Sequence, residues 1–229
     1  ELIAGLALKK NKPVKLLIVG CGNIGQFIAH NFKEFNLTGV EIEGFLDDDS
    51  ERWGGAICGY PVLGGVNQLE KIRNPTSVVV GIGDPRIRKN IIDEYSSGNL
   101  LFPNLISKNV WISKEVSLGR GIIIYPGTQI NFESSIGDFV IINMNCSIGH
   151  NSTISQFSTL SPGVSLGGFT HIEEGVLMGI NSATKQGIQI GKNSIVGGMS
   201  MIVKDLPANV TAMGVPARVT KKNLSIKMN

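Results

Sequence analysis

The sequence predicts a chain of two parts, an α/β domain over residues 1–100 and an all-β parallel β-helix over residues 101–229. Three observations predict this division. A six-residue repeat of aliphatic residues runs from Leu101 to Val203. Before Leu101 the repeat is absent, and apolar runs of strand length alternate with stretches of helical spacing. The first of these apolar runs enters a glycine-rich turn, Gly20–Gly25.

The β-helix is predicted by the period of the repeat. Every sixth residue from Ile106 to Ile202 is apolar except Thr184. Neither a helix nor an alternating strand has this period, whereas a parallel β-helix is built from such structural repeats. We expect the repeat residue to point inward and to stack on its copies in neighbouring coils, where burial is worth about 1.5–3 kcal/mol per side chain. Purely structural rods share such repeats, so the pattern predicts the fold and leaves the function open.

The residues around each repeat position are typical of tight corners. The residue two positions earlier is small or β-branched. A glycine often stands directly after the repeat residue, where a turn needs a positive φ or a close approach of two backbones. These glycines are Gly119, Gly137, Gly149, Gly167, Gly179, Gly191 and Gly197.

The first part of the chain reads as strands and helices in alternation, which implies a parallel sheet. We expect strands over 15–19, 40–46, 62–63 and 77–82, and helices over 24–35 and 85–95. The order of strand, glycine turn, helix and second strand is that of a Rossmann-like nucleotide-binding domain.

Composition excludes several classes of function. Lys and Arg number 21 against 18 Asp and Glu, with no basic stripe among aromatic residues, so nucleic acid is not an expected partner. Three widely spaced cysteines show neither a metal spacing nor a disulfide framework, which favours reduced thiols in the cytoplasm and no bound metal. No apolar run has the length of a membrane span, and in residues 1–12 the positive charges follow the apolar part, the wrong order for a signal peptide.

The glycine turn has the pattern G-x-G-x-x-G between a strand and a helix. In this context backbone N–H groups at the start of the helix can face a phosphate, and an acidic residue at the end of the second strand can accept from a ribose or base. Asp47 and Asp48 stand at that place. NAD is the usual ligand of the motif, but this part spans about half a dinucleotide fold and can hold one nucleotide. A tight turn without a ligand is the alternative.

Seven segments together resemble one family of enzymes. They are VGCGNIG (19–25), GFLDDD (44–49), VVGIGDPRIRKNI (79–91), NMNCSIGHNSTI (143–154), GINSATKQGIQIG (179–191), GGMSMIVKDLP (197–207) and GVPARV (214–219). The chain resembles the bacterial hexapeptide-repeat sugar acetyltransferases, nearest the UDP-4-amino-sugar N-acetyltransferases of bacillosamine-type pathways. The sialic acid O-acetyltransferase-like proteins are similar too.

The resemblance implies a left-handed β-helix that forms a homotrimer, with active sites between neighbouring rods. Acetyl-CoA would lie along the groove between rods, and the α/β domain would hold the nucleotide of the acceptor. For the acceptor the matching residues are Cys21, Gly22 and Asn23 near the phosphates, Asp47 and Asp48 near the base or ribose, and Gly81 lining the pocket. For acetyl-CoA they are Thr159, Gly168, Ile180 and Gly198, with 214–216 as a closing loop and Lys204, Arg218, Lys221 and Lys222 as candidates for its phosphates.

His150 is the candidate general base. Transfer of an acetyl group to an amine needs a group that takes the amine proton, and histidine titrates near neutrality. The chain has three histidines; His30 falls in the first helix and His171 directly precedes a repeat residue. His150 follows a repeat residue and a glycine, so we expect it to leave the coil at a corner, and it matches the family's catalytic histidine.

Asparagine stands at two further positions of the site. The family often has an acid after its catalytic histidine, where this chain has Asn151, so the base is either weaker or oriented by another acceptor. Asn143 matches a position that contacts ligand, although both asparagines also suit a corner without function. Cys146 is a corner residue, and no cysteine matches a nucleophile, which predicts direct transfer without an acetyl-enzyme.

The sequence therefore predicts an acetyl-CoA-dependent N-acetyltransferase that acts on a nucleotide-linked, UDP-type 4-amino-4,6-dideoxy sugar for surface glycan synthesis. The first alternative is an O-acetyltransferase acting on sialic acid or a related sugar. A non-catalytic nucleotide-sugar-binding protein is the alternative from another class. The nucleotide-type α/β domain favours the N-acetyltransferase.

Overall fold

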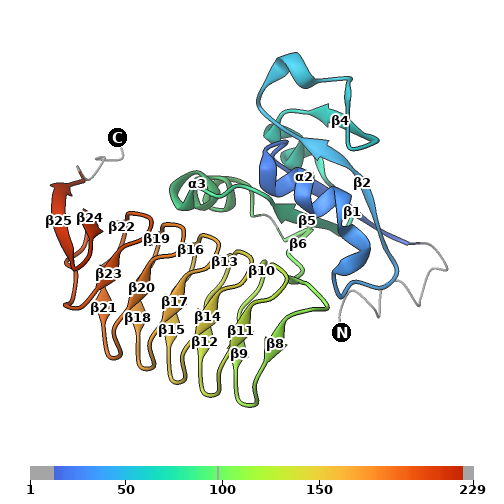
Figure 1. The fold of residues 1–229 in the computed structure, drawn as a ribbon. Helices are drawn as coiled ribbons and strands as arrows, with labels where there is room; N and C mark the ends of the chain where they lie inside the picture. Colours follow the sequence, from blue (N-terminus) through green and yellow to red (C-terminus); the bar gives the residue numbers. More distant parts are fainter. Residues whose placement is uncertain (1–12, 97, 224–229) are drawn as a thin grey trace. The chain divides into compact units, whose positions relative to one another are not determined.

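A computed structural model describes residues 13–96 and 98–223, and Figure 1 shows the fold. The chain divides into two compact units. Of the described residues, one unit holds those up to Gly83 and those within Ile87–Leu105, and the other holds Asp84–Arg86 and those from Ile106 onward. The expectation about residues 1–12 lies outside the described residues. Within 13–96 and 98–223, no helix combines the length and the apolar character needed to cross a membrane.

The first unit contains a six-stranded sheet. Its strands, in spatial order, are β3 (Ala56–Ile57), β4 (Tyr60–Gly64), β2 (Val40–Leu46), β1 (Val14–Val19), β5 (Thr76–Val80) and β6 (Leu100–Leu101). All neighbours are parallel except β3 and β4, which are antiparallel. Its helices are α2 (Asn23–His30) and α3 (Pro85–Tyr95), with short 3₁₀ turns η1 (Phe32–Glu34), η2 (Ser50–Arg52) and η3 (Val66–Lys71). The predicted Rossmann-like domain is confirmed.

The first helix is shorter than the expected span 24–35. It ends at His30, and a separate 3₁₀ turn follows. Asn31 stands at the break with φ −111° and ψ 21°, and its side-chain Nδ2 donates to the Phe27 carbonyl at 2.9 Å. An asparagine side chain that bonds to nearby backbone competes with the continuing helix. The helical spacing of the apolar residues therefore continues beyond the residue at which the helix ends.

The strand order creates a ligand-binding place at the carboxyl end of β1. Strand β1 lies between β2 and β5, so the chain leaves β1 toward β2 on one side and reaches β5 on the other. Open α/β sheets bind ligands outside the carboxyl ends of the strands at such a switch point. The turn after β1 and the residues after β5 meet there, and Gly81 N–H donates to the Val19 carbonyl at 2.8 Å.

The second unit is the predicted parallel β-helix (Figure 1). The strands of its coils are two residues long, and two longer strands follow at its end. The first face contains β7 (Leu105–Ile106), β10 (Ile123–Ile124), β13 (Ile141–Ile142), β16 (Thr159–Leu160), β19 (Leu177–Met178) and β22 (Ile195–Val196), followed by β24 (Val210–Gly214) and β25 (Ala217–Lys222). The second face contains β8 (Trp111–Ile112), β11 (Gln129–Ile130), β14 (Ser147–Ile148), β17 (Ser165–Leu166), β20 (Ala183–Thr184) and β23 (Met201–Ile202). The third face contains β9 (Ser117–Leu118), β12 (Ser135–Ile136), β15 (Thr153–Ile154), β18 (His171–Ile172) and β21 (Gln189–Ile190).

The repeat residues form the core of the rod. From Ile124 to Ile202 each repeat side chain is buried, with an exposed fraction no larger than the 6 % of Thr184. Strands three steps apart along the chain pair in parallel, so that Ile130 lies beside Ile148 and Ile148 beside Leu166. Stacking of many coils thus buries a ladder that one coil could not bury alone.

The corners show whether the glycines after the repeat residues are needed for a positive φ or for close approach of two backbones. The residues with a positive φ recur every sixth position from Glu115 (59°) to Met199 (58°), two residues beyond the glycines that follow the repeat. Those glycines are needed for close backbone approach instead. A Cβ on Gly149 would lie 2.5 Å from the Gly168 nitrogen, a distance that real Cβ atoms essentially never show.

Thr184, the exception in the repeat, points into the core like its apolar counterparts. Its hydroxyl accepts from the Gly167 N–H at 3.0 Å and lies 2.9 Å from the Thr170 hydroxyl. The Thr170 hydroxyl itself donates to the Gly167 carbonyl at 2.6 Å. A hydroxyl has one hydrogen, so Thr184 donates to Thr170. The position is a buried polar contact, and the coil continues through it unbroken.

We expect Thr184→Val to lower the free energy of unfolding by about 1–2 kcal/mol, because the isosteric side chain removes both hydrogen bonds of the hydroxyl. Urea unfolding followed by circular dichroism measures the change. Thr153→Val, on the outward side of β15, is the matched control and should change it by less than about 0.5 kcal/mol. Equal effects of the two changes would contradict the buried contact.

Candidate active site

Two corner columns of the rod carry the candidate residues. The first corner joins the first face to the second and comprises residues 125–127, 143–145, 161–163, 179–181 and 197–199. The second corner joins the second face to the third and comprises residues 113–115, 131–133, 149–151, 167–169 and 185–187. Equivalent residues of successive coils are 18 positions apart and lie over one another.

His150 lies at the second corner, between two aromatic rings. It follows β14, whose Ile148 points into the core. The imidazole stacks on Phe132, with centroids 5.2 Å apart and an interplanar angle of 10°. Phe169 meets it edge-on, with centroids 5.0 Å apart. The two phenyl rings are themselves 43 % and 52 % exposed, so the imidazole sits in an apolar slot that is open to solvent.

A chain of hydrogen bonds orients the imidazole. Its Nδ1 lies 2.8 Å from the Asn151 Oδ1, and the Asn151 Nδ2 donates to the Glu133 Oε2. An amide oxygen can only accept, so Nδ1 carries a hydrogen and Nε2 keeps a free lone pair. Sequence reasoning did not find Glu133. Its signal is the 18-residue spacing, since Glu133 occupies the place of Asn151 one coil earlier.

Gly168 leaves room for the other ring nitrogen. A Cβ at this position would lie 2.7 Å from the His150 Nε2 and 2.9 Å from its Cε1. Any other residue at position 168 would therefore push the ring away. The structure brings His150, Asn151 and Gly168 together, and Nε2 is the atom that faces the space above the glycine.

The other residues expected to form the acetyltransferase site lie away from His150 within the same chain. Asn143, Ile180 and Gly198 belong to the first corner, and Thr159 is a buried residue of the first face. Six residues separate equivalent positions of two neighbouring corners, which in extended chain is about 20 Å. The Asn143 Oδ1 accepts from the Met144 N–H at 2.9 Å and so supports its own corner. Within a single chain, the residues of the first corner and first face therefore do not meet the residues around His150.

The cysteines are poor candidates for a nucleophile. Cys146 is fully buried, and burial raises the pKa of its thiol to about 11. Burial, with the negative charge of Asp47 beside it, raises the pKa of the Cys21 thiol to about 11 as well. A thiolate is the reactive form of cysteine, so both side chains are inert near neutral pH. Throughout 13–96 and 98–223, no three His, Cys, Asp or Glu side chains gather where they could hold a metal ion.

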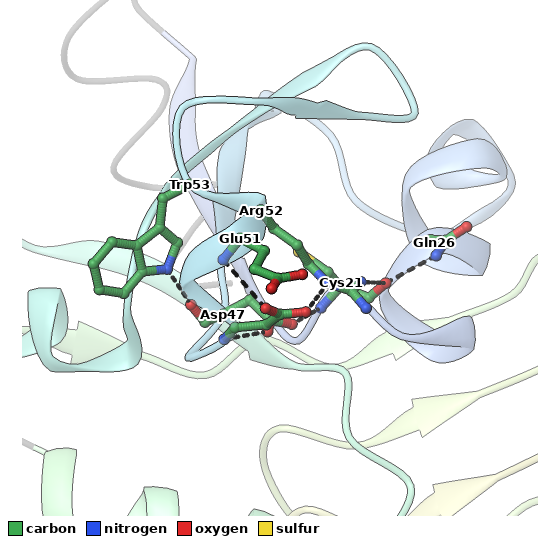
Figure 2. Close-up of polar contacts among 7 residues, drawn as sticks. Cys21, Gln26, Asp47, Glu51, Arg52 and Trp53 are labelled. Atoms are coloured by element: carbon green, nitrogen blue, oxygen red, sulfur yellow. Dashed lines mark hydrogen bonds and ion pairs between the residues drawn. The ribbon is translucent and has the colours of Figure 1, made fainter.

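The glycine turn of the first unit is tightly braced (Figure 2). The Cys21 N–H donates to the Asp47 Oδ2 at 2.6 Å, and the Gln26 Nε2 donates to the Cys21 carbonyl at 2.8 Å. The other Asp47 oxygen accepts from the Asp49 N–H at 3.0 Å, and the Trp53 Nε1 donates to the Asp47 carbonyl at 2.7 Å. Asp47 thus couples the turn after β1 to the end of β2.

Close packing fixes the shape of this turn. A Cβ on Gly25 would overlap the Gly20 carbonyl oxygen, and one on Gly81 would lie 3.0 Å from the Gly25 nitrogen. At Gly22 nothing lies within 4 Å of a Cβ, so that side of the turn is open. Gly22 is the N-cap residue of α2 and supplies no side-chain cap, and no acidic residue stands in the first turn of this helix. Uncapped N–H groups at a helix start suit a phosphate.

Three further side chains, which sequence reasoning did not assign to these contacts, shape this region. Arg52 lies above the turn, with its Nε 2.7 Å from the Asp49 Oδ2 and its Nη1 3.4 Å from the Cys21 carbonyl (Figure 2). Arg88 is buried and donates to the Ile82 carbonyl at 2.5 Å, which holds the loop after β5. Asp48 accepts from the Val66 N–H at 2.8 Å and ties the end of β2 to η3.

Comparisons with known proteins agree with both halves of the chain. Residues 15–95 match the PglD N-terminal domain. The whole fold is similar to the acetyltransferase domain of PglB from Neisseria gonorrhoeae, with TM-score 0.83, 29% sequence identity, and coverage of 90% of this chain and 98% of that one. It is also similar to PerB from Caulobacter crescentus in complex with CoA and GDP-perosamine, with TM-score 0.81, 28% identity, and coverage of 90% and 97%.

The chain is thus similar, over 90% of its length, to hexapeptide-repeat sugar N-acetyltransferases. The resemblance drawn from the sequence motifs is confirmed. Among curated proteins, the galactoside O-acetyltransferase of Lactococcus lactis is 44% identical over 52 residues, which make up 23% of this chain and 25% of that enzyme. The chain thus spans about a quarter of that curated relative.

We expect Gly168→Ala to displace the imidazole of His150, because the added Cβ would overlap its Nε2. Nitrogen-15 NMR of histidine-labelled protein should show altered ring resonances for His150. The resonances of His30 and His171 serve as internal controls and should stay in place. An unchanged His150 signal would contradict the placement of the ring over Gly168.

The thiols should differ sharply in reactivity. We expect iodoacetamide at about pH 8 to modify Cys58, which is half-buried, and to spare Cys21 and Cys146 until the protein unfolds. Peptide mass spectrometry before and after addition of urea measures the order. If Cys146 in the native protein were modified as fast as Cys58, the result would contradict the burial of the Cys146 thiol.

Proposed function

We propose that the protein is an acetyl-CoA-dependent N-acetyltransferase whose acceptor is the amino group of a UDP-linked 4-amino-4,6-dideoxy sugar. One observation carries the proposal: an imidazole at an open corner, with Nδ1 held by Asn151 and Nε2 free above Gly168. That arrangement suits a general base. The solved relatives support the substrate classes, since PerB was crystallised with CoA and GDP-perosamine and the gonococcal PglB domain with acetyl coenzyme A.

In the proposed reaction the sugar amine attacks the thioester carbonyl carbon. A C–N bond forms, the carbonyl π electrons move to oxygen, and the His150 Nε2 takes a proton from the amine. When the carbonyl re-forms, the C–S bond breaks, and the imidazolium returns its proton to the departing sulfur. The products are the N-acetylated sugar and the CoA thiol. The raised pKa values of the buried thiols support direct transfer without an acetyl-enzyme.

The α/β domain predicted over residues 1–100 would serve as the nucleotide-sugar-binding domain, and residues 101–229 as the acetyltransferase domain. Phosphate binding is proposed near Cys21, Gly22 and Asn23. The uncapped start of α2 supports it for Gly22 and Asn23, whereas the Cys21 N–H already donates to Asp47. Asp47 and Asp48 each bond to a backbone N–H, and a carboxylate has acceptor positions left for a ribose or base. Gly81 packs against the turn and would line the same pocket.

The rod is proposed to act as a homotrimer. The residues expected to bind acetyl-CoA divide between corners, with Ile180 and Gly198 on the first and Gly168 on the second. A second copy could bring its first corner to the second corner of its neighbour and so unite the two sets with Thr159 and Asn143. Both corners carry exposed apolar side chains that such a contact would cover: Ile180 at 55%, Met199 at 68%, Phe132 at 43% and Phe169 at 52% exposed. The cytoplasmic location stays a prediction.

An O-acetyltransferase acting on sialic acid or a related sugar is the second candidate. The match to a galactoside O-acetyltransferase favours it, although that match covers 52 residues. An alcohol acceptor needs the same general base as an amine, so the residues of the β-helix do not distinguish an O-acetyltransferase from an N-acetyltransferase. The braced glycine turn favours a nucleotide-linked acceptor. A nucleotide-sugar-binding protein without catalysis is the candidate from another class.

We expect His150→Ala to lower kcat by about 10²–10⁴-fold, because the amine then lacks its general base. The assay is thiol release from acetyl-CoA with a panel of UDP-, GDP- and dTDP-linked 4-amino sugars and free sialic acid. Affinity for CoA, measured by calorimetry, should stay within about threefold, since the base is not a CoA ligand.

His171→Ala, on the exposed side of β18, is the matched control and should keep full turnover. Unchanged turnover in His150→Ala would refute the mechanism. Activity on free sialic acid alone would favour the O-acetyltransferase, and no turnover with any acceptor would favour the binding protein.

A further inference from the structure

We infer that Glu133 is the positioning residue for His150 and acts through Asn151. The inference rests on the proposed function and deepens it. The Asn151 side chain stands between the two: its Oδ1 faces the His150 Nδ1 at 2.8 Å, and its Nδ2 donates to the Glu133 Oε2. The carboxylate that is missing next to the histidine in sequence is supplied from the preceding coil.

Glu133 determines which way the amide faces. An ionised carboxylate only accepts hydrogen bonds, so it selects the NH₂ end of Asn151. The amide oxygen is then left for the imidazole, and it can pair only with an Nδ1 that carries a hydrogen. Nε2 therefore keeps its lone pair at the face above Gly168, where the substrate amine is proposed to lie. With the amide reversed, Nδ1 would have to accept, and Nε2 would carry the hydrogen and could not act as a base.

The hydrogen bonds that link Glu133 to the imidazole run through the Asn151 amide. The groups packed on the ring, Phe132, Phe169 and the Gly168 backbone, carry no charge. The remaining charged residues of the second corner are Lys114, Glu115 and Lys185, in other coils. Glu115 is the counterpart of Glu133 one coil earlier, and both are exposed with a positive φ, 59° and 53°. Glu115 is therefore a control matched in residue type, backbone and exposure.

The test compares Glu133→Gln with Glu115→Gln. A glutamine can donate as well as accept, so Asn151 loses its fixed direction. We expect Glu133→Gln to lower kcat about tenfold, the lower end of the range for hydrogen-bond partners that orient a metal-bound histidine, with KM for both substrates within about twofold. Glu115→Gln should match the unchanged protein in both constants. Equal kcat in the two variants would overturn the inference.

Nitrogen-15 NMR of the histidine rings gives a readout that does not need activity, with His150 assigned by loss of its signal in His150→Ala. In the neutral form of the ring, the unchanged protein and Glu115→Gln should show the His150 hydrogen on Nδ1. Glu133→Gln should show a mixture of both tautomers. The same tautomer in all three proteins would overturn the inference. If the tautomer shifts as expected but no acceptor is acetylated, the positioning role stands and the proposed function fails.

A rescue variant separates positioning from a general loss of structure. In Glu133→Gln combined with Asn151→Asp, the new carboxylate accepts directly from Nδ1, and the glutamine amide introduced at position 133 can donate to it. We expect kcat to return to within about threefold of the unchanged protein and the Nδ1 hydrogen to be fixed again. A double variant as slow as Glu133→Gln, with mixed tautomers, would contradict the relay.

Discussion

The backbone hydrogen bonds between successive coils are the interaction on which the rest of the rod depends. Each short strand pairs with the strand 18 residues later, as Ile148 pairs with Leu166, and the corners join in through bonds such as Phe169 N–H to the His150 carbonyl at 2.8 Å. This ladder holds the repeat side chains in register inside the rod. It also decides which corner residues lie over one another, because the corners have no core of their own.

The candidate site follows from that register. Phe132, His150 and Gly168 occupy one place in three successive coils, and so do Glu133, Asn151 and Phe169. The stacked ring of Phe132, the edge-on ring of Phe169 and the backbone of Gly168 define the slot for the imidazole. Its orientation comes from two side chains of the neighbouring column. The chemistry thus rests on a rigid scaffold, where small changes in side-chain direction are suppressed by packing.

Most of the fold could be predicted from the sequence, because both halves have periodic signals. The six-residue period specified the rod and placed His150 at a corner, and the glycine turn specified the start of α2. The end of the helix before Asn31 was not predicted, because it depends on a hydrogen bond rather than on the spacing of apolar residues. Thr184 could not be interpreted for the same reason: its hydroxyl finds a partner, Thr170, that no local pattern reveals.

The site was predicted less completely than the fold. The residues near His150 in sequence were identified, whereas Glu133 and Arg52 were not, because each acts on a residue far along the chain. For Glu133 the distance is one coil, so reading the sequence in steps of 18 would have placed it beside Asn151. For Arg52 the link runs between η2 and the turn after β1, and the sequence carries no period that connects them.

The stacked corners also set limits on how such a rod can change its length. A whole coil of 18 residues could be gained or lost without altering which side chains point inward, since every coil presents the same backbone to its neighbours. Beyond Phe169 such an event would leave the imidazole and its partners untouched. Between Glu133 and Gly168 it would separate the carboxylate from the amide or the ring from its glycine. The coils between Glu133 and Gly168 therefore have to stay consecutive, whereas whole coils elsewhere in the rod can be added or removed. We expect variation in the length of the rod to occur outside them.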